Sequence, residues 1–178
     1  MLAPEVPMSH SVAGEPPSAG RRAAPLTTAV YSVAEWELLT GLPGRVLVAA
    51  ARHSSGRPPR GVAAGLAGLE AVAAGRASDS DLVRAVVADI YARPDGPTAP
   101  ADRLADLVDL LAACRAAVRV LRRRADPADS AAYRQWAQSV AGRVCRVGTT
   151  GAPAPAGGPV APADRRFLDR LGGALDLG

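Results

Sequence analysis

The sequence predicts an all-α protein, a single compact bundle of about six to seven helices behind a disordered N-terminal tail. Apolar residues recur at spacings of three and four, which is typical of helices with one buried face. The strict alternation that marks a half-buried strand is missing. Aromatic residues make up only 3% of the chain, and an Ala-rich core with few aromatics suits closely packed helices better than sheets.

The first 30 residues are expected to form the disordered tail. They offer no apolar face whose burial could offset the entropy of ordering, and prolines are scattered through them. A helical domain then spans 31–178. Within it, the Gly- and Pro-rich stretch 148–161 predicts a flexible connector, and 162–176 predicts a C-terminal helix.

A capping box is expected where the ordered part begins. The hydroxyl of Ser32 can accept a hydrogen bond from the amide of Glu35, and the Glu35 carboxylate can reach back to the amide of Ser32. Gly41 and Pro43 predict the end of this short first helix. Pro43 also suits the first position of a helix, so a separate second helix is predicted over 43–53.

A third helix is predicted to run to about Ala74, where Gly75 stops it. Gly65 and Gly68 are three residues apart, so they smooth one face and could let another backbone approach closely. The apolar stripe of this helix, at spacings of four, three and three, consists of Val62, Leu66, Leu69 and Val72.

Three further helices complete the bundle. The fourth is capped by Ser78 or Asp79 and runs to about residue 92. Pro100 starts the fifth, and Asp126 followed by Pro127 starts the sixth, which runs to about residue 147. The apolar seam of the fifth helix consists of Leu104, Leu107, Leu111, Cys114, Val118 and Leu121, and the inward residues of the sixth are Tyr133, Trp136, Val140, Val144 and Val147.

All 21 basic residues are Arg, since the chain has no Lys, and the net charge is +4. This bias, together with the abundance of Ala, Gly and Pro, is typical of a GC-rich bacterial genome. The positive charge is therefore weak evidence that the protein binds nucleic acid. No aromatic residue interleaves with the Arg side chains, and no helix-turn-helix reader is evident. The Arg side chains that could contact a partner are nonetheless Arg115, Arg119, Arg122 and Arg123, with Arg124, Arg134, Arg143 and Arg146 nearby in sequence.

No catalytic residue or cofactor is predicted. The two histidines, His10 and His53, lie in the tail and at a helix end, so neither is placed as a base for a nucleophile. Cys114 and Cys145 are expected to be free, largely buried thiols rather than a zinc site or a disulfide. Hard-cation binding is a weaker alternative, through the acidic side of the fifth helix at Asp102, Asp106 and Asp109.

The chain shows no basic segment leading into an apolar run and no stretch of 18 apolar residues. No secretory signal and no membrane span are therefore predicted, and we expect a cytoplasmic protein.

Two segments carry a resemblance. Ser32–Trp36, followed by Leu42 and Pro43, resembles the opening of small uncharacterised bacterial all-helical proteins. The segment from Gly158 to Leu168 resembles the helix entry of tellurite-resistance-type domains. That second resemblance implies an all-α fold and metal binding through acidic residues. The pattern departs from the family where Ala161 replaces the capping Ser and Asp164 stands where Glu is usual.

These observations favour a non-enzymatic helical protein that acts through contacts with another protein of unknown identity. The alternatives are a metal- or small-ligand-binding domain of the tellurite-resistance type and a weak, Arg-driven nucleic-acid binder. The C-terminal helix presents Phe167 and Leu171, which either close the bundle or dock on a partner. Folding back is the expected outcome, because such a face left bare would favour aggregation. The partner would then contact the Gly-smoothed face of the third helix or the Arg-rich end of the fifth.

Overall fold

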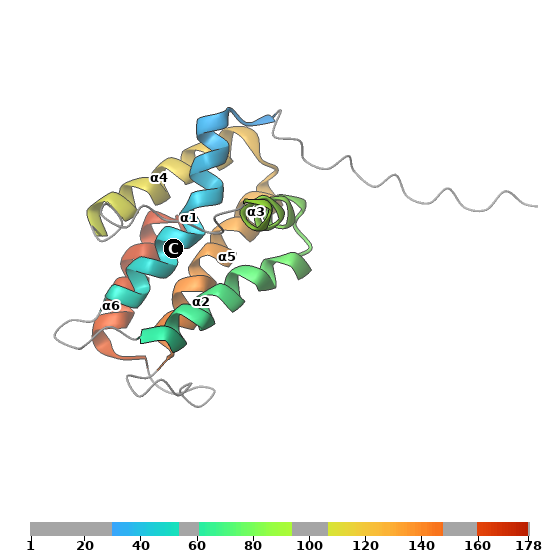
Figure 1. The fold of residues 1–178 in the computed structure, drawn as a ribbon. Coiled ribbons are helices and arrows are strands. Elements are labelled where there is room, and N and C mark those ends of the chain that lie inside the picture. The colour runs from blue at the N-terminus through green and yellow to red at the C-terminus, as the bar shows by residue number, and fades with distance from the viewer. Residues whose placement is uncertain (1–29, 54–60, 94–106, 148–159, 178) are drawn as a thin grey trace, which may run out of the picture.

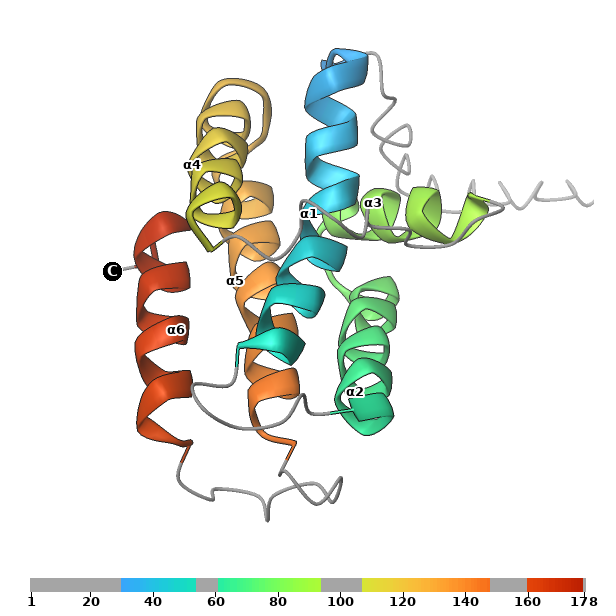
Figure 2. The ribbon, with the colours of Figure 1, turned by 60° about the vertical axis from the view of Figure 1, so that its left-hand side comes forward.

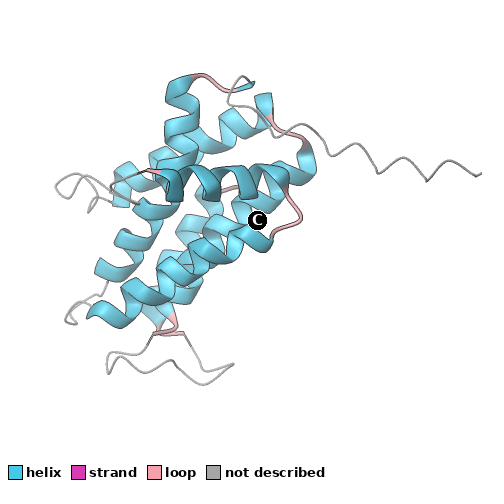
Figure 3. Ribbon diagram, turned by 45° about the vertical axis from the view of Figure 1, so that its right-hand side comes forward, coloured by secondary structure: helices cyan, strands magenta, loops and turns pink. Residues whose placement is uncertain are grey.

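A computed structural model describes residues 30–53, 61–93, 107–147 and 160–177. Within these ranges the chain forms α-helices, with short stretches of 3-10 helix and no strand, so the all-α prediction is confirmed (Figure 3). The predicted tail, apart from Val30, and the predicted connector, apart from Val160 and Ala161, lie outside the described residues. The helices are α1 Val33–Arg52, α2 Gly61–Ala74, α3 Asp81–Ala92, α4 Leu107–Arg124, α5 Pro127–Cys145 and α6 Pro162–Ala174, and a 3-10 helix spans Gly75–Ala77.

The centre of the bundle is α5, which contacts all of the other helices. It lies against α1, and α2 and α6 flank this pair on opposite sides (Figures 1 and 2). Helix α4 packs on α1 and α6, and α3 runs crosswise to the rest at one end of α2 (Figure 2). The inward residues predicted for the sixth helix are all buried, four of them in α5 and Val147 just after its end. That stripe was therefore predicted correctly.

The expected capping box is present at the start of α1. Ser32 Oγ accepts from the amide of Glu35 at 3.2 Å, and the amide of Ser32 donates to the Glu35 carboxylate at 2.9 Å. That contact is the main reason why the pKa of Glu35 lies below its ordinary value of 4.5, and the nearby guanidinium groups of Arg124 and Arg123 lower it further. Asp126 caps α5 in the predicted place, with Pro127 as its first residue. The cap of α3, however, is Ser80 rather than Ser78 or Asp79.

The prediction of two helices over residues 32–53 is wrong, because α1 is continuous and contains Pro43. A proline inside a helix has no N–H for the carbonyl four residues earlier, which here belongs to Leu39. The hydroxyl of Tyr133, from α5, donates to that carbonyl at 2.6 Å. Both side chains are fully buried. The hydrogen bond that Pro43 removes is thus replaced from another helix, and α1 runs on.

Helix α6 folds back on the bundle and closes it. Phe167 and Leu171 are buried among α4 and α5, and the ring of His53, at the end of α1, stacks on Phe167 with centroids 4.8 Å apart. After the last turn, the amide of Asp176 donates to the carbonyl of Gly173 and the amide of Leu177 to that of Gly172. These two bonds form a Schellman motif in which Asp, not Gly, takes the left-handed position, with φ 58°.

Candidate functional site

Helix α2 exposes most of its large aliphatic side chains and buries mainly small residues, the reverse of an ordinary amphipathic helix. Three large aliphatic side chains remain in solvent, with Val62 80% exposed, Leu66 56% and Leu69 38%. Of the apolar stripe seen in the sequence, only Val72 is buried. The residues that α2 buries are otherwise small: Ala64, Gly68, Ala71 and, just after the helix, Gly75. The stripe as a whole therefore does not face the core.

Close approach of large neighbours explains why α2 buries its small residues. A Cβ atom at Gly68 would lie 2.6 Å from Cγ of Leu47 on α1 and 2.9 Å from a methyl of Val144 on α5. A larger residue there would collide with both. Gly68 thus allows the close approach that the sequence suggested, although side chains of α1 and α5, rather than a backbone, fill the space.

Trp136 fixes the other end of α2 against α5. Its indole N–H donates to the carbonyl of Ala71 at 3.2 Å, and a Cβ atom at Gly75 would lie 2.8 Å from the same nitrogen. The ring therefore needs small residues beneath it. Since α1 and α5 leave space only for small residues on the side of α2 that faces them, most of the large residues of α2 lie on its opposite, exposed side.

The exposed side of α2 is an apolar surface with a notch in it. Apart from the adjoining residues and backbone of α2 itself, none of the described atoms lies within 4 Å of the point where a Cβ atom would stand at Gly61 or Gly65. The stretch from Gly61 to Leu69 contains no charged residue. We use the name α2 face for the surface formed by Gly61, Val62, Gly65, Leu66 and Leu69.

Several of the Arg side chains predicted to contact a partner form ion pairs within the chain instead. Arg122 of α4 pairs with Asp176 at 2.7 Å, and Arg134 of α5 pairs with the same carboxylate at 3.0 Å. Arg123 and Arg124 lie 3.4 and 3.6 Å from the carboxylate of Glu35. These contacts tie the end of α4 to α1 and to the end of α6.

Two candidates, Arg115 and Arg119, are exposed on α4 and form no ion pair with another described residue. They are one turn apart, so they offer two guanidinium groups on one side of the helix. Arg143 and Arg146, at the far end of α5, are exposed as well. The predicted Arg patch therefore consists of separate groups rather than one continuous surface.

Of the three acidic candidates for a cation site, Asp102 and Asp106 lie outside the described residues. Asp109 is exposed in the first turn of α4, and its backbone carbonyl accepts from Arg45 at 3.3 Å. Within the part of the chain that the structure describes, no three His, Cys, Asp or Glu residues gather closely enough to hold a metal ion. Metal binding of the tellurite-resistance type stays a prediction.

Phe167 and Leu171 are 1% and 0% exposed. Their apolar contacts are made within the chain, so they offer no surface to a partner in this state.

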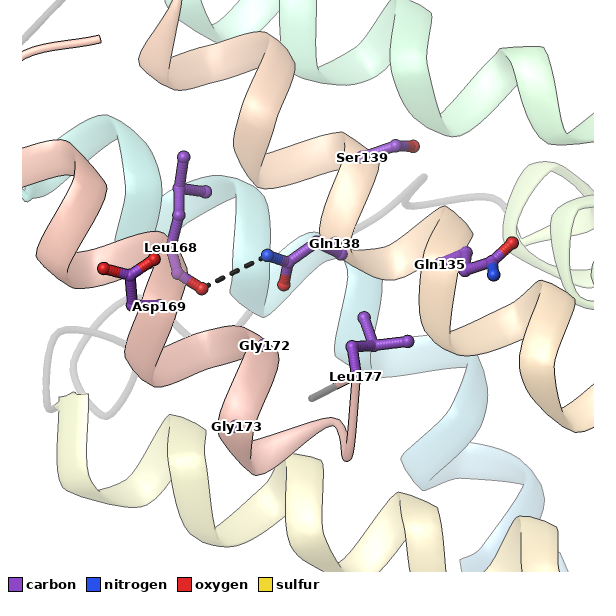
Figure 4. A pocket seen from close by; sticks show the side chains of 8 residues that line it. All are labelled: Gln135, Gln138, Ser139, Leu168, Asp169, Gly172, Gly173 and Leu177. Carbon is purple, nitrogen blue, oxygen red and sulfur yellow. Dashed lines mark hydrogen bonds between the residues drawn. The ribbon is translucent and has the colours of Figure 1, made fainter.

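A shallow groove of about 680 Å³ lies between α5 and α6 (Figure 4). Gln138 reaches across it and donates to the carbonyl of Leu168 at 3.2 Å, which ties the two helices together. Its other amide atom, Oε1, is buried without a hydrogen-bond partner among the described residues. Asp169 is the only charged residue in the lining, which comprises Gln135, Gln138, Ser139, Leu168, Asp169, Gly172, Gly173 and Leu177.

Both thiols are free and buried, as predicted. Desolvation raises the pKa of Cys114 to about 12, although the nearby Arg45 and Arg115 act in the opposite direction. The thiol is therefore protonated and inert at neutral pH. Burial likewise raises the pKa of Tyr133 well above 10, so its hydroxyl remains a hydrogen-bond donor to Leu39.

Two further findings bear on what the chain is. None of its described helices has the length and apolar character needed to cross a membrane. No family model, curated protein or solved structure matches the chain.

Proposed function

We propose that this chain is a non-enzymatic protein that binds another protein through the α2 face. The observation that carries the proposal is the reversal of α2, which buries Gly and Ala and leaves Val62, Leu66 and Leu69 in solvent. Burying one such side chain contributes roughly 1.5–3 kcal/mol relative to leaving it exposed. Folding buries these side chains only in part, since Val62 stays 80% and Leu66 56% exposed, so the free energy of burying the rest is available to a partner.

The arrangement of the three exposed side chains favours a binding site over chance exposure. Single exposed aliphatic residues are common on soluble proteins, whereas contiguous apolar patches mark interaction sites. Val62, Leu66 and Leu69 follow the spacing of i, i+4 and i+7, so they line one side of the helix. Helices that dock on a protein partner present their anchoring residues at this spacing.

The Arg candidates support the proposal less. Three Arg side chains at the end of α4, and Arg134 within α5, contact carboxylates of the same chain. Their contribution to a partner would first require those pairs to open. The α2 face needs no such change.

The proposal is tested by photo-crosslinking in the cells that naturally make the protein. A photoreactive residue replaces Val62, which is 80% exposed. We expect discrete protein adducts from this position. The same experiment is repeated in a Leu66→Glu background, where a buried carboxylate would oppose docking, and we expect the adducts to disappear.

A matched control places the photoreactive residue at Ala112, which is exposed on α4. Adducts that also form from position 112, or that persist with Leu66→Glu, are nonspecific. If position 62 gives no adduct beyond those, the proposed function is wrong.

A further inference from the structure

Within the proposed function, and resting on it, we infer that the partner of the α2 face is a second copy of this chain, docked through a two-fold contact between the two α2 helices. The inference rests on the shape and the charge of the α2 face.

The α2 face carries a ridge and a groove side by side. Val62 and Leu66 are four residues apart and form the ridge; Gly61 and Gly65 have the same spacing and form the groove beside it. Helices pack when the rows of side chains at a spacing of four on one helix enter the grooves between such rows on the other. The groove is open, because apart from the adjoining residues and backbone of α2 itself none of the described atoms lies within 4 Å of either missing Cβ atom.

A two-fold contact requires that one surface carry both complementary features, since the same residues appear on each side of the axis. The α2 face meets that requirement. The ridge at Leu66 of one copy can enter the notch at Gly65 of the other, and the reverse contact forms at the same time. An unrelated partner would need only one of the two features.

Charge also favours a second copy here. The chain has a net charge of +4, and most of its other helices expose Arg side chains, for example Arg119 on α4 and Arg166 on α6. Contacts through those surfaces would place like charges together when two copies meet. The stretch from Gly61 to Leu69 has no charge, so it can face itself without repulsion. A partner of opposite charge would gain nothing at this surface.

The contact is small, so the dimer should be weak. Stable interfaces bury about 800 Å² on each partner and involve roughly 20–30 residues a side, and one helix face provides less. We therefore expect a dissociation constant on the order of 10–100 μM, typical of a reversible contact.

Sedimentation equilibrium of the full chain over a range of concentrations tests the inference. The mean mass should rise from that of one chain toward that of two. Leu66→Glu should abolish the rise, because each new carboxylate would be buried without a partner in the uncharged notch at Gly65 of the other copy. Gly65→Ala should weaken association about tenfold or more by filling the notch, while the folded monomer gains stability from the better helix former. Arg119→Glu, on another surface, should leave association unchanged.

A chain that stays monomeric up to about 1 mM, well above the expected dissociation constant, would overturn the inference. So would a Gly65→Ala variant that associates as tightly as the unmodified chain. The proposed function has a separate outcome: a monomeric chain that still gives Leu66-dependent adducts to a different protein in cells keeps the proposed function and rejects the second copy.

Discussion

The hydroxyl of Tyr133 donates a 2.6 Å hydrogen bond to the backbone carbonyl of Leu39, and this bond lets α1 pass through Pro43 without a break. The carbonyl belongs to the residue four positions before the proline, whose own nitrogen has no hydrogen to give. Buried carbonyls left unpaired cost about 1–3 kcal/mol. Tyr133 therefore both packs in the core as part of α5 and stabilises α1 through this hydrogen bond.

Tyr133→Phe should lower the free energy of unfolding by about 1–3 kcal/mol, because the ring is kept while the buried carbonyl of Leu39 loses its donor. In a Pro43→Ala background the same change should cost less, since the amide of the new residue can donate to Leu39. Urea denaturation of the four proteins of this double-mutant cycle measures the coupling. Equal costs in both backgrounds would refute the role given to Tyr133. Tyr91→Phe, at an exposed ring, is the matched control.

Gly68→Ala should destabilise the protein by roughly 1–3 kcal/mol, because its methyl group would overlap Leu47 and Val144. Gly65→Ala, three residues earlier on the same helix, has open space and should raise stability by up to about 1 kcal/mol. Thermal unfolding of the two variants compares them directly. If both changes stabilise the protein, α2 does not pack closely on α1 and α5.

Arg134 should matter more to the end of α6 than Arg122 does. Arg134 is 17% exposed and donates to the carbonyls of Leu175 and Asp176 as well as to the Asp176 carboxylate, whereas Arg122 is 64% exposed and contacts the carboxylate alone. We expect Arg134→Ala to cost about 1–2 kcal/mol and Arg122→Ala less than about 0.5 kcal/mol. Chemical denaturation measures both. Equal losses would mean that charge pairing, not capping of the α6 carbonyls, holds the helix end.

The buried thiols should resist modification in the folded protein. Burial raises the pKa of Cys114 to about 12, so at pH 8 almost none of it is the reactive thiolate. We expect a thiol reagent such as Ellman's to react with neither Cys114 nor Cys145 until the chain unfolds, and with both afterwards. Rapid reaction of Cys114 in the native state would show that this part of the core opens readily.

Features that depend on neighbours in sequence could be predicted. The capping box of Ser32 and Glu35 and the cap at Asp126 involve residues at most three positions apart, so the pattern alone specifies them. The buried stripe of α5 was also predictable, because its large residues recur at helical spacing on a helix that has neighbours on every side.

Features that depend on residues far apart in the sequence could not be predicted. Pro43 suggested a helix end, because its compensating donor, Tyr133, lies 94 residues away from Leu39. The ion pairs of Arg122 and Arg123 join residues 54 and 88 positions apart, so the sequence showed only exposed Arg. The same holds for the candidate site: its large residues resembled a core stripe, and only Leu47, Val144 and Trp136 show why the small residues of α2 face inward.

If the α2 face is a docking surface, its exposed side chains contribute little to the stability of the fold. The most direct test is the free energy of unfolding of Leu66→Gln beside that of Val72→Ala, measured by urea denaturation at a protein concentration low enough to keep the chain monomeric. Leu66 is 56% exposed and Val72 is 2% exposed. We predict a change within about 0.5 kcal/mol for Leu66→Gln and a loss of about 2 kcal/mol or more for Val72→Ala. A loss with Leu66→Gln as large as that with Val72→Ala would show that Leu66 belongs to the core, and would contradict the account.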